Sequence, residues 1–320
     1  MKLSKLDKAC VIAIRDCMGA QKNESVLVVT DEVKKKIGYA LFENAKRLGH
    51  DTLFVEMKSL DMHGQEPLHY VSELMKLFDV VLCPTAKSLT HTNARRNASA
   101  LGARIATFPG ITEEIMIRGL NADYNRIAAL TIKLQEILHD VNVVRVTSAI
   151  GTDITMDISG RKALPSKGLF HKKGESGNLP TGEAYIAPLE GKSNGVFYVD
   201  GSMASLGVVK GKPIRIDVVD GMAVKVTGDA FAKKLDSTLT KFGPLSRNIA
   251  EFGIGTNHKA KLSGVLLEDE KVMGTIHIAL GDNKSMGGNV DIPIHLDGVI
   301  KKPTVYFDGS MIMKNGKLVI

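Results

Sequence analysis

The stretch DIPIHLDG, at residues 291–298, places a histidine and an aspartate two positions apart between apolar residues. Alternate side chains of a β-strand share a face, so His295 and Asp297 are expected to point the same way. The stretch GTIHIALGDN repeats the pattern, with His277 on the face opposite its two isoleucines. If the two strands are neighbours, the three polar side chains meet at one place. The alternative is a pair of half-buried strands with a polar outer face.

Further carboxylates and a histidine stand near glycine bends in the same part of the chain. NLPTGEAYIAP carries Glu183, and IAEFGIGTNHKAKLSG carries Glu251 followed by His258. A divalent metal needs deprotonated carboxylates and neutral imidazoles on stiff elements. Mixed Glu, His and Asp ligands suit Zn²⁺, Co²⁺, Mn²⁺ or Fe²⁺. The pattern therefore predicts a divalent metal site in the C-terminal half.

The first 140 residues alternate strand and helix signals, which predicts an α/β domain. Each short apolar run is followed by a segment with helical spacing, and this alternation is typical of a mainly parallel sheet with helices on its faces. No G-x-G-x-x-G follows the first strand, and the G-x-x-x-x-G-K-[ST] phosphate loop does not occur. A nucleotide-binding fold with the usual phosphate loop therefore has little support. The predicted strands are SVLVVT (25–30), DTLFVEM (51–57), DVVLCP (79–84) and ARIATF (103–108).

From about residue 141 apolar and polar residues alternate along the chain, which is the period of two residues expected of β-strands. Short β segments are separated by Gly, Asp-Gly and Asn-Gly turns, and only GDAFAKKLDSTLTKFG (228–243) has helical spacing. The sequence thus predicts two domains. Residues 1–140 form the α/β domain, and residues 141–320 form a β-rich, mostly antiparallel domain that carries the metal site.

Composition and charge argue against a membrane protein, a secreted protein and a nucleic-acid-binding protein. The chain is 44% hydrophobic, and it has no run approaching the roughly 18 apolar residues of a membrane span. Charges at Lys8, Arg15 and Asp16 interrupt the N-terminal apolar patch, so no signal peptide is expected and a cytoplasmic location is predicted. The net charge of +7 is scattered and lacks neighbouring aromatic residues, so neither a nucleic acid nor a membrane is expected as a partner.

The C-terminal part resembles the aminopeptidase T family of metallo-aminopeptidases. The stretches that carry the likeness are NLPTGEAYIAP, AEFGIGTNHKAKLSGVLLEDEKVMGTIHIALGDN, DIPIHLDGV and PTVYFDGSMI. The resemblance implies a homodimer that removes N-terminal amino acids from small peptides through a metal-activated water. It also implies that the carboxylates of Glu183 and Glu251 are catalytic. The metal ligands implied by the resemblance are Glu183, Glu251, His277, His295 and Asp297.

One position departs from that family's pattern. The family has a tyrosine ligand shortly after its first histidine, whereas the corresponding stretch here reads GDNKSMGG, with Lys284 near the expected place. This departure leaves open whether the site holds one metal ion or two.

The same part of the chain is similar to a shorter relative, the ring-cleaving dihydroxypyridine dioxygenase, which uses one non-haem iron. That resemblance aligns His258, His295 and Asp297 with a two-histidine, one-carboxylate set, which suits iron-dependent oxygen chemistry. The alternative function is therefore a mononuclear non-haem iron dioxygenase that cleaves a hydroxylated pyridine or similar aromatic ring. A requirement for Fe(II), rather than Zn, Co or Mn, separates this small-molecule reaction from peptide hydrolysis.

Overall fold

The computed structural model describes residues 3–320, which divide into two compact units. The division falls inside helix α6 (Tyr124–His139), which the sequence prediction assigned whole to the first domain. A later segment also returns to the first unit. Unit 1 comprises Met1–Ala128 with Lys167–Thr181, and unit 2 comprises Ala129–Ser166 with Gly182–Ile320.

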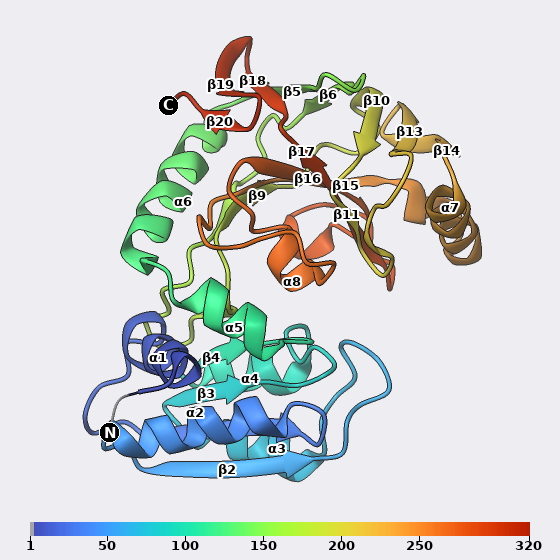
Figure 1. Ribbon diagram of the computed structural model, residues 1–320. Helices are drawn as coiled ribbons and strands as arrows, with labels where there is room; N and C mark the ends of the chain where they lie inside the picture. Colours follow the sequence, from blue (N-terminus) through green and yellow to red (C-terminus); the bar gives the residue numbers. More distant parts are fainter. Residues whose placement is uncertain (1–2) are drawn as a thin grey trace. The chain divides into compact units, whose positions relative to one another are not determined.

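Unit 1 is built on a five-stranded parallel sheet (Figure 1). Its strands are β1 (Val26–Asp31), β2 (Thr52–Met57), β3 (Val80–Cys83), β4 (Arg104–Thr107) and β8 (Ser176–Asn178). They lie in the order β2-β1-β3-β4-β8. Strands β1, β3 and β4 are buried throughout, as expected for continuous apolar runs in a parallel sheet covered on both faces.

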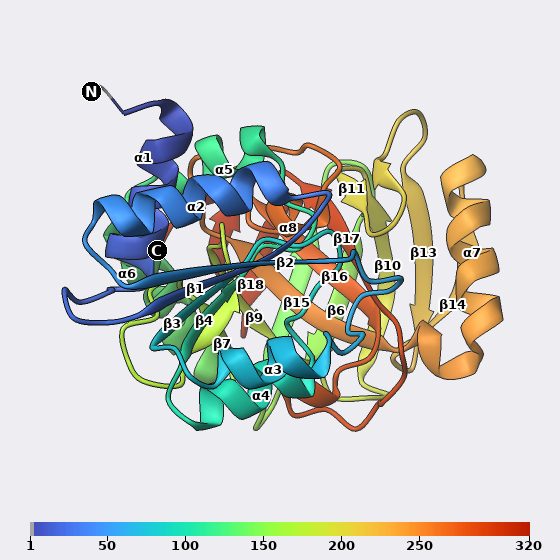
Figure 2. The ribbon, with the colours of Figure 1, turned by 90° about the horizontal axis from the view of Figure 1, so that it is seen from below.

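Helices cover both faces of this sheet. The helices of unit 1 are α1 (Lys5–Val11), the π-helical segment Ile12–Cys17, α2 (Lys35–Arg47), α3 (His69–Met75), α4 (Asn93–Ala100) and α5 (Glu113–Leu120). Figure 2 shows α2 on one side of the sheet and α3 with α4 on the other. The side chains of Thr92 and Thr112 cap α4 and α5 by accepting backbone N–H hydrogen bonds, which satisfies donors that have no partner within a helix.

Unit 2 contains two sheets. The eight-stranded sheet B has the order β14-β13-β10-β6-β5-β18-β19-β20, and the seven-stranded sheet C has the order β12-β11-β17-β16-β15-β9-β7. Sheet B consists of β5 (Val143–Thr147), β6 (Asp153–Asp157), β10 (Ser193–Val199), β13 (Ile214–Val219), β14 (Met222–Thr227), β18 (Thr304–Phe307), β19 (Ser310–Lys314) and β20 (Lys317–Leu318). Sheet C consists of β7 (Leu164–Ser166), β9 (Glu183–Ile186), β11 (Ser202–Met203), β12 (Gly207–Val208), β15 (Ile249–Gly255), β16 (Thr275–Gly281) and β17 (His295–Lys301).

One hydrophobic core joins the two sheets of unit 2. It includes Phe197 of sheet B together with Phe252, Ile276 and Ile278 of sheet C. The remaining helices are α7 (Ala230–Phe242), α8 (Leu266–Asp269) and the 3₁₀ segments Pro244–Arg247 and Lys284–Met286. Because Ile276 and Ile278 face this core, the alternate residues of β16 lie on the opposite face of sheet C.

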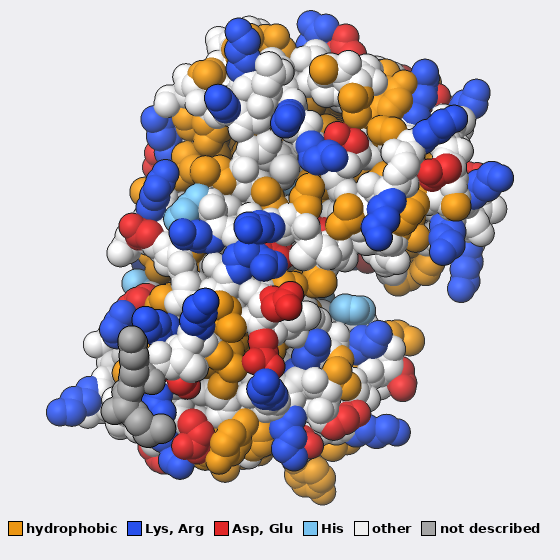
Figure 3. All heavy atoms as spheres, viewed as in Figure 1, with side chains coloured by type: hydrophobic (Ala, Val, Ile, Leu, Met, Phe, Trp, Pro, Cys, Tyr) orange, Lys and Arg blue, Asp and Glu red, His pale blue; other side chains and the backbone are white. Residues whose placement is uncertain are grey.

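The predicted fold class is confirmed: a parallel α/β unit is followed by a β-rich unit whose sheets are antiparallel. The strand β8 was not predicted, because the three residues Ser176–Asn178 have no strand pattern in the sequence. They form a strand through their pairing with β4. None of the helices in residues 3–320 is both long and apolar enough to cross a membrane. On the face drawn in Figure 3, lysine and arginine side chains are interspersed with acidic and apolar ones.

Candidate metal centre

Three neighbouring strands of sheet C place the predicted ligands in adjacent rows. Glu251 of β15 pairs with Ala279 of β16, and Ala279 pairs with Asp297 of β17. His277 stands two residues before Ala279, and His295 stands two residues before Asp297. All four polar side chains therefore share the face of sheet C that lies away from the hydrophobic core.

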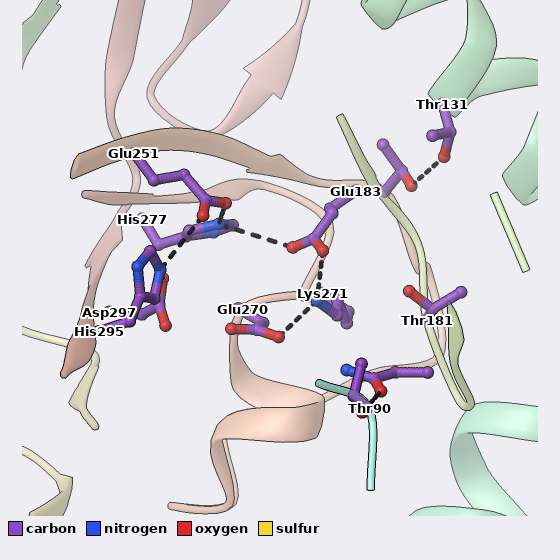
Figure 4. Close-up of polar contacts among 12 residues, drawn as sticks. Thr90, Thr131, Thr181, Glu183, Glu251, Glu270, Lys271, His277, His295 and Asp297 are labelled. Atoms are coloured by element: carbon purple, nitrogen blue, oxygen red, sulfur yellow. Dashed lines mark hydrogen bonds and ion pairs between the residues drawn. The ribbon is translucent and has the colours of Figure 1, made fainter. Parts of the chain in front are cut away.

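Glu183 joins the same face from the next strand. It begins β9 and pairs with Gly255, which stands four residues after Glu251 on β15. The even spacing keeps Glu183 and Glu251 on one side of the sheet. Figure 4 shows both carboxylates directed toward the imidazole of His277.

The carboxylate of Glu251 is shared between the two histidines. Its Oε1 lies 3.1 Å from Nε2 of His277, and its Oε2 lies 3.2 Å from Nε2 of His295. The same nitrogen of His277 is 3.5 Å from Oε2 of Glu183, and that of His295 is 3.4 Å from Oδ1 of Asp297. The carboxylate thus bridges two sets of ligand-type atoms.

Two groups of three side chains each bring one atom apiece to within 4.8 Å of one another. The first ligand group is Glu183, Glu251 and His277, and the second ligand group is Glu251, His295 and Asp297. Carboxylate oxygens and imidazole nitrogens are donors that Fe²⁺, Mn²⁺, Co²⁺ and Zn²⁺ accept. The donor chemistry of either group therefore fits a divalent ion.

Small residues make room for these side chains in the middle of the sheet. Gly253 of β15 pairs with His277, and a Cβ atom built on it would lie within 3.0 Å of the imidazole ring. A Cβ on Gly255 would lie equally close to the backbone of Lys271 and Val272. The two glycines therefore allow an imidazole ring and a loop to approach the strand closely.

Burial and charge set the protonation of the metal-free groups. Burial favours a raised pKa for Glu251, but hydrogen bonds from His277 and His295 outweigh it and hold that pKa below its usual range. Burial favours a lowered pKa for His277, yet Glu251 raises the pKa to about 9. The pKa of His295 is likewise raised well above its usual value, against burial, by Asp297 and Glu251. A metal ion must displace protons from these imidazoles.

A second contact fixes the orientation of His295. Its Nδ1 lies 2.7 Å from the backbone carbonyl oxygen of Asp282. The ring donates its Nδ1–H to that oxygen, which leaves Nε2 to face Glu251 and Asp297. A carbonyl behind a histidine ligand fixes the tautomer and the ring orientation in this way in many metal sites.

A buried lysine that the sequence prediction did not single out lies beside these groups. The ammonium of Lys271 is 2.5 Å from Oε1 of Glu183 and 2.5 Å from Oε1 of Glu270. Burial raises the pKa of Glu270 to about 8. Lys271 ends the acidic run LEDEK (267–271), and nothing in the spacing of that run shows that the lysine is buried between Glu270 and a carboxylate of a distant strand.

The loop that carries Lys271 is held by buried carboxylates of α8. Asp269 accepts hydrogen bonds from the backbone N–H groups of Ser263 and Gly264, at 2.6 and 3.0 Å, and Glu268 accepts one from Lys261. Asp269 is fully buried. Its role is therefore structural: its buried carboxylate accepts hydrogen bonds from backbone amides and so fixes the course of the loop.

Replacing Asp269 by alanine is expected to lower the free energy of unfolding by about 2–4 kcal/mol, because the loop amides lose their carboxylate acceptor and a cavity replaces a fully buried side chain. Urea denaturation followed by circular dichroism measures this change. Asp291→Ala, at an exposed aspartate, is the control and should change the value by less than about 0.5 kcal/mol. Equal stability of Asp269→Ala and the unmodified protein would show that the loop does not depend on this carboxylate.

His258 lies outside the two ligand groups. Within residues 3–320 it belongs to neither ligand group and lies in the turn after β15, where Asn257 accepts backbone hydrogen bonds from Lys259 and Ala260. The strand ends at Gly255, so the alternation that aligns Glu251 with the site does not extend to His258. Each group consequently has one histidine and two carboxylates, which differs from the expected two-histidine set.

The position that corresponds to the peptidase tyrosine is also outside the centre. Lys284 is exposed and forms an ion pair with Asp291, which is exposed as well. Neither residue belongs to a ligand group among the described residues.

Several solved structures match this chain, and two of them share its fold over nearly its whole length. 2,5-Dihydroxypyridine dioxygenase from Pseudomonas putida KT2440 has a TM-score of 0.84 and 18% identity, over 99% of this chain and 98% of that one. AmpT from Thermus thermophilus has a TM-score of 0.71 and 17% identity, over 99% of both chains. At such identities these structures show the shared fold alone. No curated protein matches the chain.

A family model gives the more specific result. The model of 2,5-dihydroxypyridine 5,6-dioxygenase, NicX, matches residues 5–320. The match covers nearly the whole sequence and includes both units and every residue of the two ligand groups. The chain therefore belongs to the 2,5-dihydroxypyridine 5,6-dioxygenase family.

Proposed function

We propose that the protein is a mononuclear non-haem iron dioxygenase that cleaves a hydroxylated pyridine or a similar aromatic ring. The observation that carries the proposal is the convergence of Glu251, His295 and Asp297 in a chain of this family. These three side chains would hold Fe(II). When bound, Fe(II) supplies the redox chemistry that lets O₂ react with an electron-rich ring.

The surrounding side chains orient the ligands and handle protons. His277 donates a hydrogen bond from Nε2 to Oε1 of Glu251, which fixes the direction of that carboxylate. Burial raises the pKa of Glu183, so its Oε2, which lies beside His277, is suited to accept a proton from a ring hydroxyl. Glu183 is thus the general base in the proposed reaction.

The first expectation, a metallo-aminopeptidase, is supported only by the likeness of fold to AmpT. The family match favours the alternative. One observation keeps the hydrolase as a second candidate: Glu251 is shared by both ligand groups, and a shared carboxylate is a common feature of two-metal hydrolytic sites. The metal requirement and the consumption of O₂ distinguish the two reactions.

Anaerobically purified protein, loaded separately with Fe²⁺, Zn²⁺, Co²⁺ or Mn²⁺, is the material for the decisive assay. With 2,5-dihydroxypyridine, only the Fe²⁺ form is expected to consume O₂, in equimolar amount with the substrate, as the ring absorbance disappears. Amino-acid amides should remain intact with every metal. Hydrolysis of the amides by the Zn²⁺ or Co²⁺ form, without O₂ uptake on hydroxypyridines, would reject the dioxygenase.

A further inference from the structure

Lys271 supplies a fixed positive charge next to the first ligand group. Its side chain is only 3% exposed, and its ammonium contacts Glu183 and Glu270 (Figure 4). Since Oε1 of Glu183 is occupied by this contact, only Oε2 faces His277. The first ligand group therefore already has a cation on one of its two carboxylates.

We propose that Lys271 takes the place of a second metal ion, so that the centre binds one divalent ion per chain, at the second ligand group. The carboxylates of Glu251 and Asp297 offset the charge of that ion, while Lys271 offsets the charge of Glu183. A second divalent ion at the first ligand group would lie close to the buried ammonium, where repulsion between like charges is screened least. Glu183 consequently holds Lys271 and does not ligate metal.

The lysine cannot easily leave this position, because its backbone is bonded to the turn that follows β15. The backbone N–H of Asn257 donates to the carbonyl of Lys271 at 2.9 Å, and Asn257 forms a β-bridge with Val272. Gly255 lets this segment cross β15 at close range. The ammonium is thus held beside Glu183 before any metal arrives.

This inference uses the metal position of the proposed function but does not depend on ring cleavage. Manganese serves as the probe, since the EPR spectrum of Mn²⁺ distinguishes an isolated ion from an exchange-coupled pair. Metal-free protein is titrated with Mn²⁺, and bound metal per chain is determined by elemental analysis after gel filtration. We expect one isolated Mn²⁺ in the unmodified protein, and two coupled ions in Lys271→Met.

Two control variants accompany these measurements. Lys271→Arg retains the charge and should keep one ion, and Lys259→Met makes the same change at an exposed lysine of the neighbouring turn. Two ions in the unmodified protein would overturn the inference, as would a single ion in a folded Lys271→Met variant.

If Lys271→Met does not fold, Glu183→Gln decides the question. The variant should keep one Mn²⁺ with a Kd within about threefold of the original, because removing a direct ligand typically costs far more than a factor of ten. Loss of the ion from Glu183→Gln would refute the assignment. One ion without ring cleavage would reject only the proposed function, and two ions with ring cleavage would reject only the role of Lys271.

Discussion

Replacing Glu251 by glutamine is expected to abolish metal binding and ring cleavage in a protein that still folds. The carboxylate belongs to both ligand groups, and each of its oxygens faces the Nε2 atom of a histidine. Glutamine has nearly the same shape, but it removes the negative charge and presents an amide nitrogen to one of the rings. Metal affinity should fall at least about 100-fold, and activity at fixed Fe²⁺ should fall at least about 1,000-fold.

Elemental analysis, a metal titration and O₂ uptake measure these losses. The matched control is Glu136→Gln, the same chemical change at an exposed position of α6, which should leave all three readouts unchanged. Circular dichroism establishes that both variants are folded. Retention of a full equivalent of iron by Glu251→Gln would remove Glu251 from the ligand set and, with it, the second ligand group.

The convergence of His277, His295 and Asp297 on one face of the sheet was predictable because it follows from strand parity. His295 and Asp297 alternate along one strand and His277 lies on the next, so the pairing of Ala279 with Asp297 brings all three together. What the sequence does not contain is the list of neighbours of each strand. The contact between His277 and Gly253 depends on the pairing of β15 with β16, which joins residues 24 positions apart in the chain.

Lys271 shows more clearly what could not be predicted from the sequence alone. Lys271 lies in an acidic run that has the composition of a solvated surface segment. It becomes buried because Asp269 and Glu268 fold the loop around backbone amides and because Gly255 leaves space beneath it. Since these causes involve separate segments, neither local composition nor periodicity could show them.

The choice between hydrolase and dioxygenase could not be made from the ligand types alone. Carboxylates and imidazoles serve both Zn²⁺ or Co²⁺ in hydrolysis and Fe²⁺ in oxygen chemistry. The absence of a tyrosine in the stretch GDNKSMGG was a sign against the peptidase ligand set. His258 stays a predicted ligand: among residues 3–320 it belongs to neither ligand group, since the strand carrying Glu251 ends at Gly255, before that histidine is reached.

Gly253→Ala is expected to destabilise the protein and to disturb the centre, although it adds only one methyl group. The new Cβ would lie within 3.0 Å of the ring of His277, which is fully buried and cannot retreat into solvent. Overpacking costs about 1–3 kcal/mol, and a displaced ring that loses its hydrogen bond to Glu251 adds about 1–3 kcal/mol. Metal affinity should fall about tenfold as the direction of Glu251 changes.

A double-mutant cycle isolates the cause of this effect. In the background of His277→Ala the ring is absent, so Gly253→Ala should be neutral or slightly stabilising, because alanine restricts the unfolded chain more than glycine does. Urea denaturation of the four proteins gives the coupling free energy, which should reach about 2 kcal/mol or more. An equal loss of stability in both backgrounds would mean that the strand backbone itself requires glycine. In that case the role of Gly253 is not to leave room for the imidazole ring of His277.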